Sequence, residues 1–362
     1  MNNRQSNMKL FYDFYEKIFD KDYENEQQLM IGGKDKHDIL MTKNTIDFNE
    51  DFVNVDTDDF IFKYSQLTEK ISYEAALIAE KKEGDKADMH LGQFKLFFSE
   101  LLFLTKYIKD ATKILYVGAA EGYHISKLAD LFPDIKFDLW DPRKFDLQAR
   151  KNIKLYDQYF TDNLAQMYAK DNDKILFLCD IRTLKVAKFK KNKQYRKFDE
   201  LIMDDMSMQE NWVKIINPIY AYLKFRLPWF EEENFSYLPG TIYLQPYSPK
   251  STEARLMTND YTNYITYNSK EHDEKFSYFN FFYRFSYRYD RWTKIFNQYQ
   301  LKNCWDNTYA LYIVDYYLRK IHNIYSDTKV GELFMEILKF HTDKYGKKYD
   351  IVFNRETSEV QK

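Results

Sequence analysis

The sequence predicts an α/β fold with a mostly parallel central sheet, an antiparallel edge and helices on both faces of the sheet. Three observations support this prediction. Short apolar runs alternate with helix-like segments through the middle of the 362-residue chain, which is typical of a parallel sheet. Several strand-like runs then follow one another, which indicates an antiparallel edge. Hydrophobic residues make up 44% of the chain, which is enough for a sizeable core.

The elements are predicted in order along the chain. The first 70 residues show no clean period, and we expect them to form an extension of unknown role packed on a main domain at 71–325. Apolar residues recur at helical spacing in LGQFKLFFSELLFLTKYI, so a helix with a broad buried face is expected at 91–108. The remaining predictions are strands at 152–160, 174–179, 219–225, 241–247 and 253–258, helices at 162–170, 211–216, 278–298 and 310–322, and a C-terminal helix and tail at 326–362.

The segment KILYVGAAEGYHISKLADLFPDIKFDLWD, residues 113–141, predicts a strand, a tight turn, a helix, a strand and a terminal acid. This is the pattern of a nucleoside-binding half-site in a Rossmann-like fold. Gly118 and Gly122 would let the backbone approach a ligand, and Asp141 would accept hydrogen bonds from ribose hydroxyls. The Gly-x-x-x-Gly spacing favours a cofactor without phosphates, such as S-adenosylmethionine. A plain βα turn without ligand and an NAD-type oxidoreductase with a degenerate fingerprint remain open.

Bulk properties narrow the class of protein. The chain has two cysteines, Cys179 and Cys304, so neither a disulfide framework nor a zinc site is indicated, and we expect no metal site. No apolar run is long enough for a membrane span, so a soluble, intracellular protein is expected. The net charge of −2 does not indicate nucleic-acid binding. The segment KVAKFKKNKQYRK, residues 185–197, could nevertheless track phosphates, or it could be a solvated surface loop.

Charged residues follow several of the predicted strands. Asp180 follows KILFLC, Lys224 lies near the end of IYAYLKF, and Glu253 begins a Glu-x-Arg sequence at the start of EARLMT. Ligands of open α/β sheets bind beyond the carboxyl ends of the strands, so these side chains are candidate site residues. Taken singly, each could instead be a solvated strand cap.

Six motifs together resemble a known family. They are HLGQFKLFFSELLFLTK, YVGAAEGYHI, LWDPR, LFLCDIR, INPIYAYLKFRLPWF and YLQPYSPKSTEARL. In order and approximate spacing they resemble the poxvirus-type cap-specific mRNA (nucleoside-2′-O)-methyltransferase, which also serves as the small, regulatory subunit of the viral poly(A) polymerase. The resemblance runs from about Tyr73 to Arg319. It implies an S-adenosylmethionine-dependent methyltransferase fold, capped mRNA as substrate, a poly(A) polymerase catalytic subunit as partner, and a cytoplasmic or virion location.

The resemblance also implies site residues. The catalytic set would be Lys95, Asp180, Lys224 and Glu253, with Lys224 accepting the proton of a ribose 2′-hydroxyl or orienting that hydroxyl. A free lysine titrates near about 10.4, so a lysine that acts as a base must be desolvated or lie near other cations. The cofactor residues would be Gln93, Tyr116, Gly118, Gly122, Asp141 and Arg143. The cap-binding residues would be Tyr73, Trp229, Glu231 and Glu274.

RNA phosphates are expected to contact Arg182, Lys188, Lys190, Lys191 and Arg226. The chain departs from the family pattern in its N-terminal extension, in its lysine-rich segment, and in a shorter turn before Glu253. An alternative function is a non-catalytic RNA-binding subunit of a poly(A) polymerase that keeps the methyltransferase fold only as a scaffold.

Overall fold

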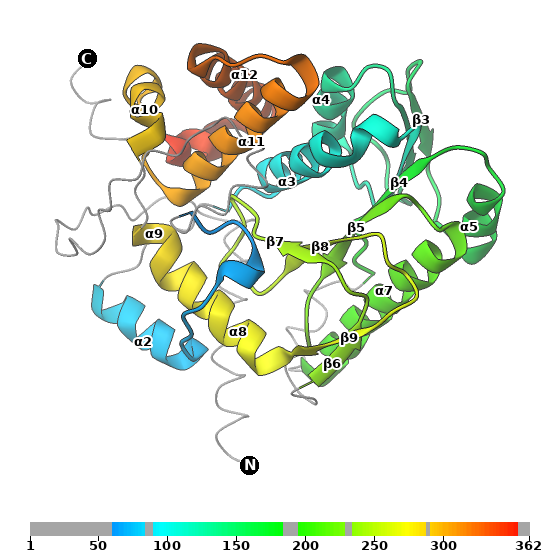
Figure 1. Cartoon of the computed structure of the whole chain (residues 1–362), viewed down its shortest axis with the longest axis horizontal. Helices are drawn as coiled ribbons and strands as arrows, with labels where there is room; N and C mark the ends of the chain where they lie inside the picture. The colour runs from blue at the N-terminus through cyan, green and yellow to red at the C-terminus, as the bar shows by residue number, and fades with distance from the viewer. Residues whose placement is uncertain (1–59, 84–89, 184–194, 229–233, 287–289, 354–362) are drawn as a thin grey trace.

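A seven-stranded sheet organises the protein (Figure 1). The computed structural model describes residues 60–83, 90–183, 195–228, 234–286 and 290–353. The strand order is β3-β2-β1-β4-β5-β8-β7. The strands are β1 Lys113–Val117, β2 Lys136–Trp140, β3 Ile153–Tyr156, β4 Ile175–Cys179, β5 Tyr220–Phe225, β7 Thr241–Tyr243 and β8 Ala254–Thr258.

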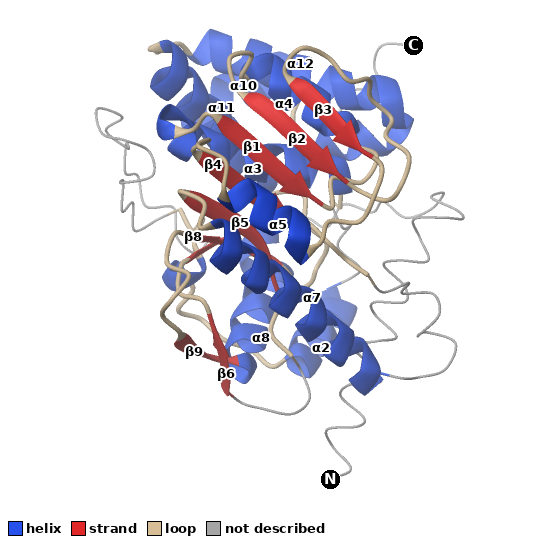
Figure 2. Ribbon diagram, turned by 90° about the vertical axis from the view of Figure 1, so that its right-hand side faces the viewer, coloured by secondary structure: helices blue, strands red, loops and turns tan. Residues whose placement is uncertain are grey.

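The sheet is parallel from β3 to β5 and antiparallel at β8 and β7, as the sequence predicts. The strands β1 and β4 are buried along their whole length because both faces carry helices, and their sequences KILYV and ILFLC are correspondingly apolar. Figure 2 shows the parallel strands running side by side between the helical layers. A second, two-stranded sheet pairs β6 (Asn234–Tyr237) with β9 (Ile265–Asn268).

Helices cover both faces of the large sheet, with α3, α4 and α11 on one side and α5 and α7 on the other (Figure 1). The helices are α2 Tyr73–Glu83, α3 Gly92–Tyr107, α4 Tyr123–Leu131, α5 Asp162–Ala169, α7 Tyr195–Ile216, α8 Ser269–Tyr278, α9 Arg284–Ser286, α10 Thr293–Tyr299, α11 Trp305–His322 and α12 Asp327–Tyr345. Every residue of α3 from Phe94 to Thr105 is buried. This burial explains why its sequence is apolar on nearly all sides. In the described part of the chain, no helix is both long and apolar enough to cross a bilayer.

The described residues of the predicted helix at 278–298 are helical, but they form several segments instead of one regular helix. The helix α8 ends at Tyr278, a π-helical turn spans Phe279–Tyr283, and α10 begins only at Thr293. The guanidinium of Arg284, just after the π-helical turn, is buried against Asp306 and the carbonyl of Ser248. A π turn inserts a residue into the helical repeat, which periodicity alone does not reveal.

Two further helices begin earlier than the sequence predicts. The helix α7 begins at 195 rather than 211, and α11 begins at Trp305 rather than 310. The acidic residues of α7, which include Asp199 and Asp205, obscure its apolar period even though both are buried.

The packed chain extends beyond the predicted main domain at both ends. Phe60 and Phe62 are each only 1% exposed, and the backbone of Phe62 accepts a hydrogen bond from the amide of Leu244, next to β7. At the other end, Phe334 and His341 of α12 contact Phe94 of α3. Residues 60–70 and α12 therefore contribute to the same core as the sheet.

Candidate active site

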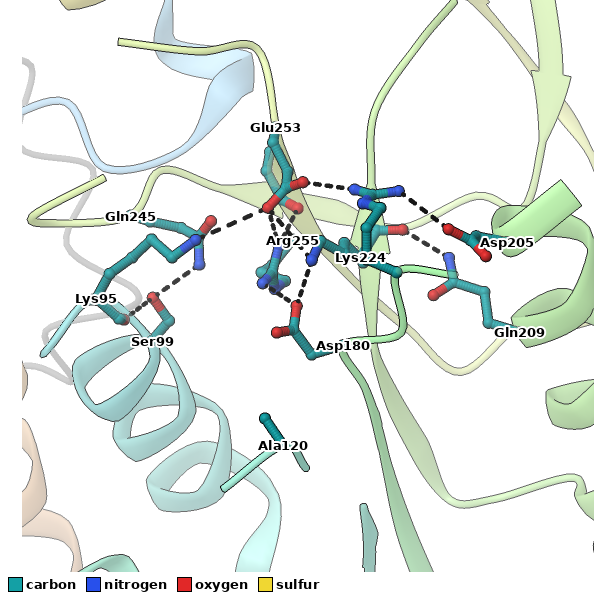
Figure 3. Close-up of polar contacts among 12 residues, drawn as sticks. Lys95, Ser99, Ala120, Asp180, Asp205, Gln209, Lys224, Gln245, Glu253 and Arg255 are labelled. Atoms are coloured by element: carbon teal, nitrogen blue, oxygen red, sulfur yellow. Dashed lines mark hydrogen bonds and ion pairs between the residues drawn. The ribbon is translucent and has the colours of Figure 1, made fainter. Parts of the chain in front are cut away.

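Four charged side chains meet at the carboxyl edge of the sheet. Asp180 follows β4, Lys224 lies on the neighbouring strand β5, and Glu253 directly precedes β8. Because β8 is antiparallel to β5, its start lies at the same edge as the end of β5. Lys95 reaches this edge from the first turn of α3. Figure 3 shows the four side chains pointing toward one another.

The distances between these groups are those of a single ionic cluster. The Lys224 Nζ lies 2.9 Å from Asp180 Oδ1 and 3.8 Å from Glu253 Oε1. The Lys95 Nζ lies 3.7 Å from Glu253 Oε1. All four side chains are between 11% and 17% exposed, so the cluster is mostly shielded from water but reachable. The structure thus brings together the four residues predicted as catalytic, although they come from four separate segments.

Arg255 lies at the centre of this cluster. Its guanidinium donates to Asp180 Oδ1 at 2.5 Å and to Glu253 Oε1 at 3.3 Å, and the residue is fully buried. The sequence pattern Glu-x-Arg includes Arg255 but predicts no role for it. The sequence could have indicated its place, because residues two apart on a strand share a face and Arg255 is two residues after Glu253. In the structure Arg255 also pairs with Lys224 across β5 and β8.

Arg182 belongs to the same cluster. It was predicted to contact RNA phosphates, yet its guanidinium donates to Glu253 Oε2 at 2.5 Å and lies 3.6 Å from Asp205 Oδ2. Asp205 also accepts hydrogen bonds from the backbone amide and hydroxyl of Thr183. In this arrangement Arg182 holds Oε2 of Glu253, whereas Lys95 lies near Oε1.

The ionic contacts shift several pKa values. Burial opposes ionisation of Glu253, but the cations Lys224, Arg182, Lys95 and Arg255 hold the pKa of Glu253 well below its usual range. Burial likewise opposes ionisation of Asp180, whose pKa the neighbouring cations nevertheless lower. Burial first, and Arg255 second, lower the pKa of Lys95 to about 8 against the opposing effect of the carboxylates. The site therefore holds two ionised carboxylates and an amine that is partly neutral near physiological pH.

The glycine turn after β1 lies against this edge. Gly118 has a φ of +79°, and a Cβ at this position would lie 2.7 Å from the amide nitrogen of Ile181 and 2.8 Å from the carbonyl carbon of Asp180. Gly122, with a φ of +68°, precedes the first turn of α4. Both positions thus require a residue that tolerates the left-handed region. The turn and Asp180 are consequently in direct backbone contact.

Asp141 directly follows β2, beside this turn, and is 3% exposed. Its Oδ2 accepts a hydrogen bond from the amide of Ala120 at 2.8 Å, and its Oδ1 accepts from the amide of Arg143 at 2.9 Å. The guanidinium of Arg143 also donates to this carboxylate, and its side chain is 64% exposed. A fixed carboxylate next to a close-approach glycine turn fits the ribose of a nucleoside cofactor.

The other two predicted cofactor residues, Gln93 and Tyr116, are joined through a buried carboxylate. The Tyr116 hydroxyl donates to Glu100 Oε1 at 2.6 Å. His124 connects Glu100 to Gln93, with its two ring nitrogens 3.0 Å from Glu100 Oε2 and 2.9 Å from Gln93 Oε1. Tyr116 is 2% exposed, so it packs between the sheet and α3, and Gln93 is the more accessible of the two. No role for Glu100 or His124 follows from the sequence alone.

Two of the predicted cap-binding residues, Trp229 and Glu231, lie outside the described residues. Tyr73 is 8% exposed and packs edge-to-face on Phe281, with 5.8 Å between the ring centroids. Glu274 is a partly exposed residue of α8, and its backbone carbonyl accepts a hydrogen bond from the amide of Ile71. Tyr73 therefore offers no open aromatic face in this conformation.

Three of the residues predicted to bind RNA, Lys188, Lys190 and Lys191, also lie outside the described residues. Arg226 is 1% exposed, donates to Asp199 Oδ1 at 2.9 Å and covers the ring of Phe198. The contact of Arg226 with phosphates thus stays a prediction, and in this structure its guanidinium is enclosed. The reason is that an acid and an aromatic ring on α7 enclose a residue that follows β5 directly.

Comparisons with known proteins assign the chain to a family. The sequence model of the poly(A) polymerase regulatory subunit matches residues 57–340. The chain belongs to the poly(A) polymerase regulatory subunit family. The match includes all of the ionic cluster, the glycine turn and Asp141, so the candidate active site of this regulatory subunit homologue lies within the family region.

Curated relatives carry the name cap-specific mRNA (nucleoside-2′-O-)-methyltransferase. The relative from Fowlpox virus (strain NVSL) is 32% identical over 222 residues, which cover 54% of this chain and 69% of the relative. The relatives from Myxoma virus, strains Lausanne and Uriarra, are each 27% identical over 210 residues, which cover 54% of this chain and 59% of the relatives. The regulatory subunit homologue thus spans about three-fifths to two-thirds of the relatives that it matches.

Proposed function

We propose that this protein is a cap-specific mRNA 2′-O-methyltransferase. It would transfer a methyl group from S-adenosylmethionine to the ribose 2′-hydroxyl of the first transcribed nucleotide of capped RNA. The observation that carries the proposal is the convergence of Lys95, Asp180, Lys224 and Glu253 at the sheet edge that also holds the glycine turn and Asp141. The names of the poxvirus relatives agree with it.

The residues beside the glycine turn suit the proposed cofactor. Asp141 would accept hydrogen bonds from the ribose hydroxyls, and Gly118 would let the backbone approach the nucleoside. Exposed Arg143, which now binds Asp141, lies where it could cover the adenosine. Gln93 would contact the methionine end. The cofactor supplies a methyl group on a positively charged sulfur, and the product is S-adenosylhomocysteine.

The ionic cluster would position the incoming ribose. Lys224 is fixed between Asp180 and Glu253, so its Nζ can direct the 2′-hydroxyl oxygen along one line of attack. With the cofactor bound, the ribose oxygen would take the methyl group from its sulfur, and the hydroxyl proton would pass to an amine of the cluster or to water. Arg182 and Arg255 hold the two carboxylates and so keep Lys224 in place.

A methyl-transfer assay on capped and uncapped RNA tests this function. Lys224→Ala should lower turnover by at least about a hundredfold, because it removes the group that orients the nucleophile, while affinity for S-adenosylhomocysteine changes little. Lys109→Ala removes an exposed lysine that follows α3 and is the matched control. Trp229→Ala should remove the preference for capped RNA if that residue stacks on the cap. Normal methyl transfer by Lys224→Ala contradicts the proposal.

A second function rests on the family match. We propose that the protein also acts as the regulatory subunit of a poly(A) polymerase, since the family model describes such subunits. Adding the protein to the cognate catalytic subunit should lengthen the poly(A) tails made per binding event. The Lys224→Ala variant should retain this effect while losing methyl transfer. If neither the wild-type protein nor the variant changes the length of the poly(A) tails, this second function is ruled out.

The cytoplasmic location of the protein stays a prediction.

A further inference from the structure

Four polar side chains form one hydrogen-bonded chain between α3, β1 and α4. Tyr116 donates to Glu100 Oε1 at 2.6 Å, His124 Nε2 lies 3.0 Å from Glu100 Oε2, and His124 Nδ1 lies 2.9 Å from Gln93 Oε1. Glu100, His124 and Tyr116 are between 0% and 2% exposed. Only Gln93, in the first turn of α3, is partly exposed. The chain of contacts therefore leads from a buried carboxylate to one accessible amide.

The chemistry of the groups sets the direction of these hydrogen bonds. Burial first, and the Glu100 carboxylate second, hold the pKa of Tyr116 well above its usual value, so the phenol keeps its proton and donates it. A carboxylate only accepts, so His124 Nε2 must carry a proton and donate it to the other Glu100 oxygen. These two donors fix Glu100, and Glu100 in turn fixes the plane of the His124 ring.

The fixed ring then determines how the Gln93 amide lies. The ring holds one end of the Gln93 side-chain amide, with Nδ1 2.9 Å from Oε1, and the other end of that amide is left for a ligand. Burying three polar side chains among the apolar residues of α3 costs free energy that an apolar set would avoid. The arrangement thus has a cost in stability, which an orienting role would explain.

We propose that His124, held by Glu100, is a positioning residue that orients the Gln93 amide toward the methionine end of S-adenosylmethionine. The inference rests on the proposed function, in which Gln93 contacts that end of the cofactor. Asp141 would then hold the ribose on one side of the turn, while the His124–Gln93 pair holds the amino-acid end on the other.

Two substitutions of His124 separate positioning from packing. In His124→Gln the side-chain amide takes the place of Nε2, so the contact with Glu100 is kept and that with Gln93 is lost. In His124→Asn the amide takes the place of Nδ1, so the contact with Gln93 is kept and that with Glu100 is lost. We expect His124→Gln to raise the Kd for S-adenosylhomocysteine about tenfold, or about 1.4 kcal/mol, with little change in Tm. We expect His124→Asn to lower Tm and to bind more tightly than His124→Gln.

A double-mutant cycle with Gln93→Ala provides the second measurement. If His124 acts through Gln93, then His124→Gln should not weaken binding further once Gln93 is alanine. Glu100→Gln, which keeps the shape of the side chain, should behave in the same way and is available if a His124 variant does not fold. The KM for capped RNA should not change in any of these variants.

Additive effects in the cycle overturn the inference, as does equal weakening by His124→Asn and His124→Gln. In either case the buried chain of contacts serves packing alone. If calorimetry shows that the wild-type protein does not bind S-adenosylhomocysteine, the proposed function is overturned as well. Failure of the positioning inference and failure of the proposed function can therefore be told apart.

Discussion

Replacing Lys95 with methionine should stabilise the protein at neutral pH and abolish methyl transfer. Burial, followed by the nearby Arg255, lowers the pKa of Lys95 from 10.5 to about 8. The folded protein therefore holds this ammonium at a free-energy cost. Methionine fills a similar volume without a charge, so Lys95→Met removes the cost together with the charge that contacts Glu253.

The magnitude follows from the pKa shift. At 1.36 kcal/mol per unit, a fall from 10.5 to about 8 corresponds to about 3 kcal/mol below pH 8. Between pH 8 and 10.5 the unfolded chain binds the proton more readily than the folded one, so the free energy of unfolding of the wild type rises with pH. The advantage of Lys95→Met should therefore fall to about 1 kcal/mol near pH 9.5.

Urea unfolding of the wild type and the variant at pH 7 and pH 9.5 measures this difference. Lys109→Met replaces an exposed lysine in the segment after α3 and should change stability by less than about 0.5 kcal/mol at either pH. The reasoning is refuted if Lys95→Met is no more stable than the wild type at pH 7, or if its advantage is the same at both pH values.

Three other substitutions test separate parts of the structure. Arg255→Lys should lower turnover at least about tenfold with little change in cofactor affinity, because a single ammonium cannot replace the two guanidinium nitrogens that contact Glu253 and Asp180 separately; single-turnover kinetics with unchanged rates would contradict this. Gly118→Ala should cost about 2 kcal/mol of stability and weaken S-adenosylhomocysteine binding, since its φ of +79° and the backbone of Ile181 leave no room for a Cβ; calorimetry with normal affinity would rule this out. Arg226→Met should cost about 3 kcal/mol by leaving Asp199 buried without its partner, and Asp199→Asn in the same chain should recover part of it. A loss of RNA affinity by Arg226→Met at full stability would instead support the original RNA-binding prediction.

The sequence sufficed to predict the sheet because each central strand is a short apolar run that ends at a turn or a charged residue. The strand that ends at Cys179 and is followed by Asp180 is an example. The same pattern of an apolar run followed by a charged residue located Asp180, one of the two acids of the ionic cluster. The carboxyl edge of a parallel sheet then implied that Lys224 would lie near Asp180, and the two are indeed in contact.

Contacts between distant segments could not be predicted in this way. Arg182 and Arg226 were both expected to contact RNA phosphates. Their partners, Glu253 and Asp199, lie 71 and 27 residues away in the sequence, and only the packing of α7 and β8 brings them together. The same reason explains why the pairing of His124 with Glu100 was missed.

Phe62 and Lys63 contact the outermost strand of the sheet, and this contact limits how far the chain can be shortened from its N-terminal side. Lys63 forms an antiparallel bridge with Tyr243, and the amide of Leu244 donates to the carbonyl of Phe62. The outermost strand β7 has only three residues, and these contacts cover the backbone groups that it would otherwise present to another molecule. Trimming the protein to residue 71 would uncover that edge and the sites of two buried phenylalanines, which favours edge-to-edge self-association. A shortened form that keeps this edge covered should therefore begin before Phe60.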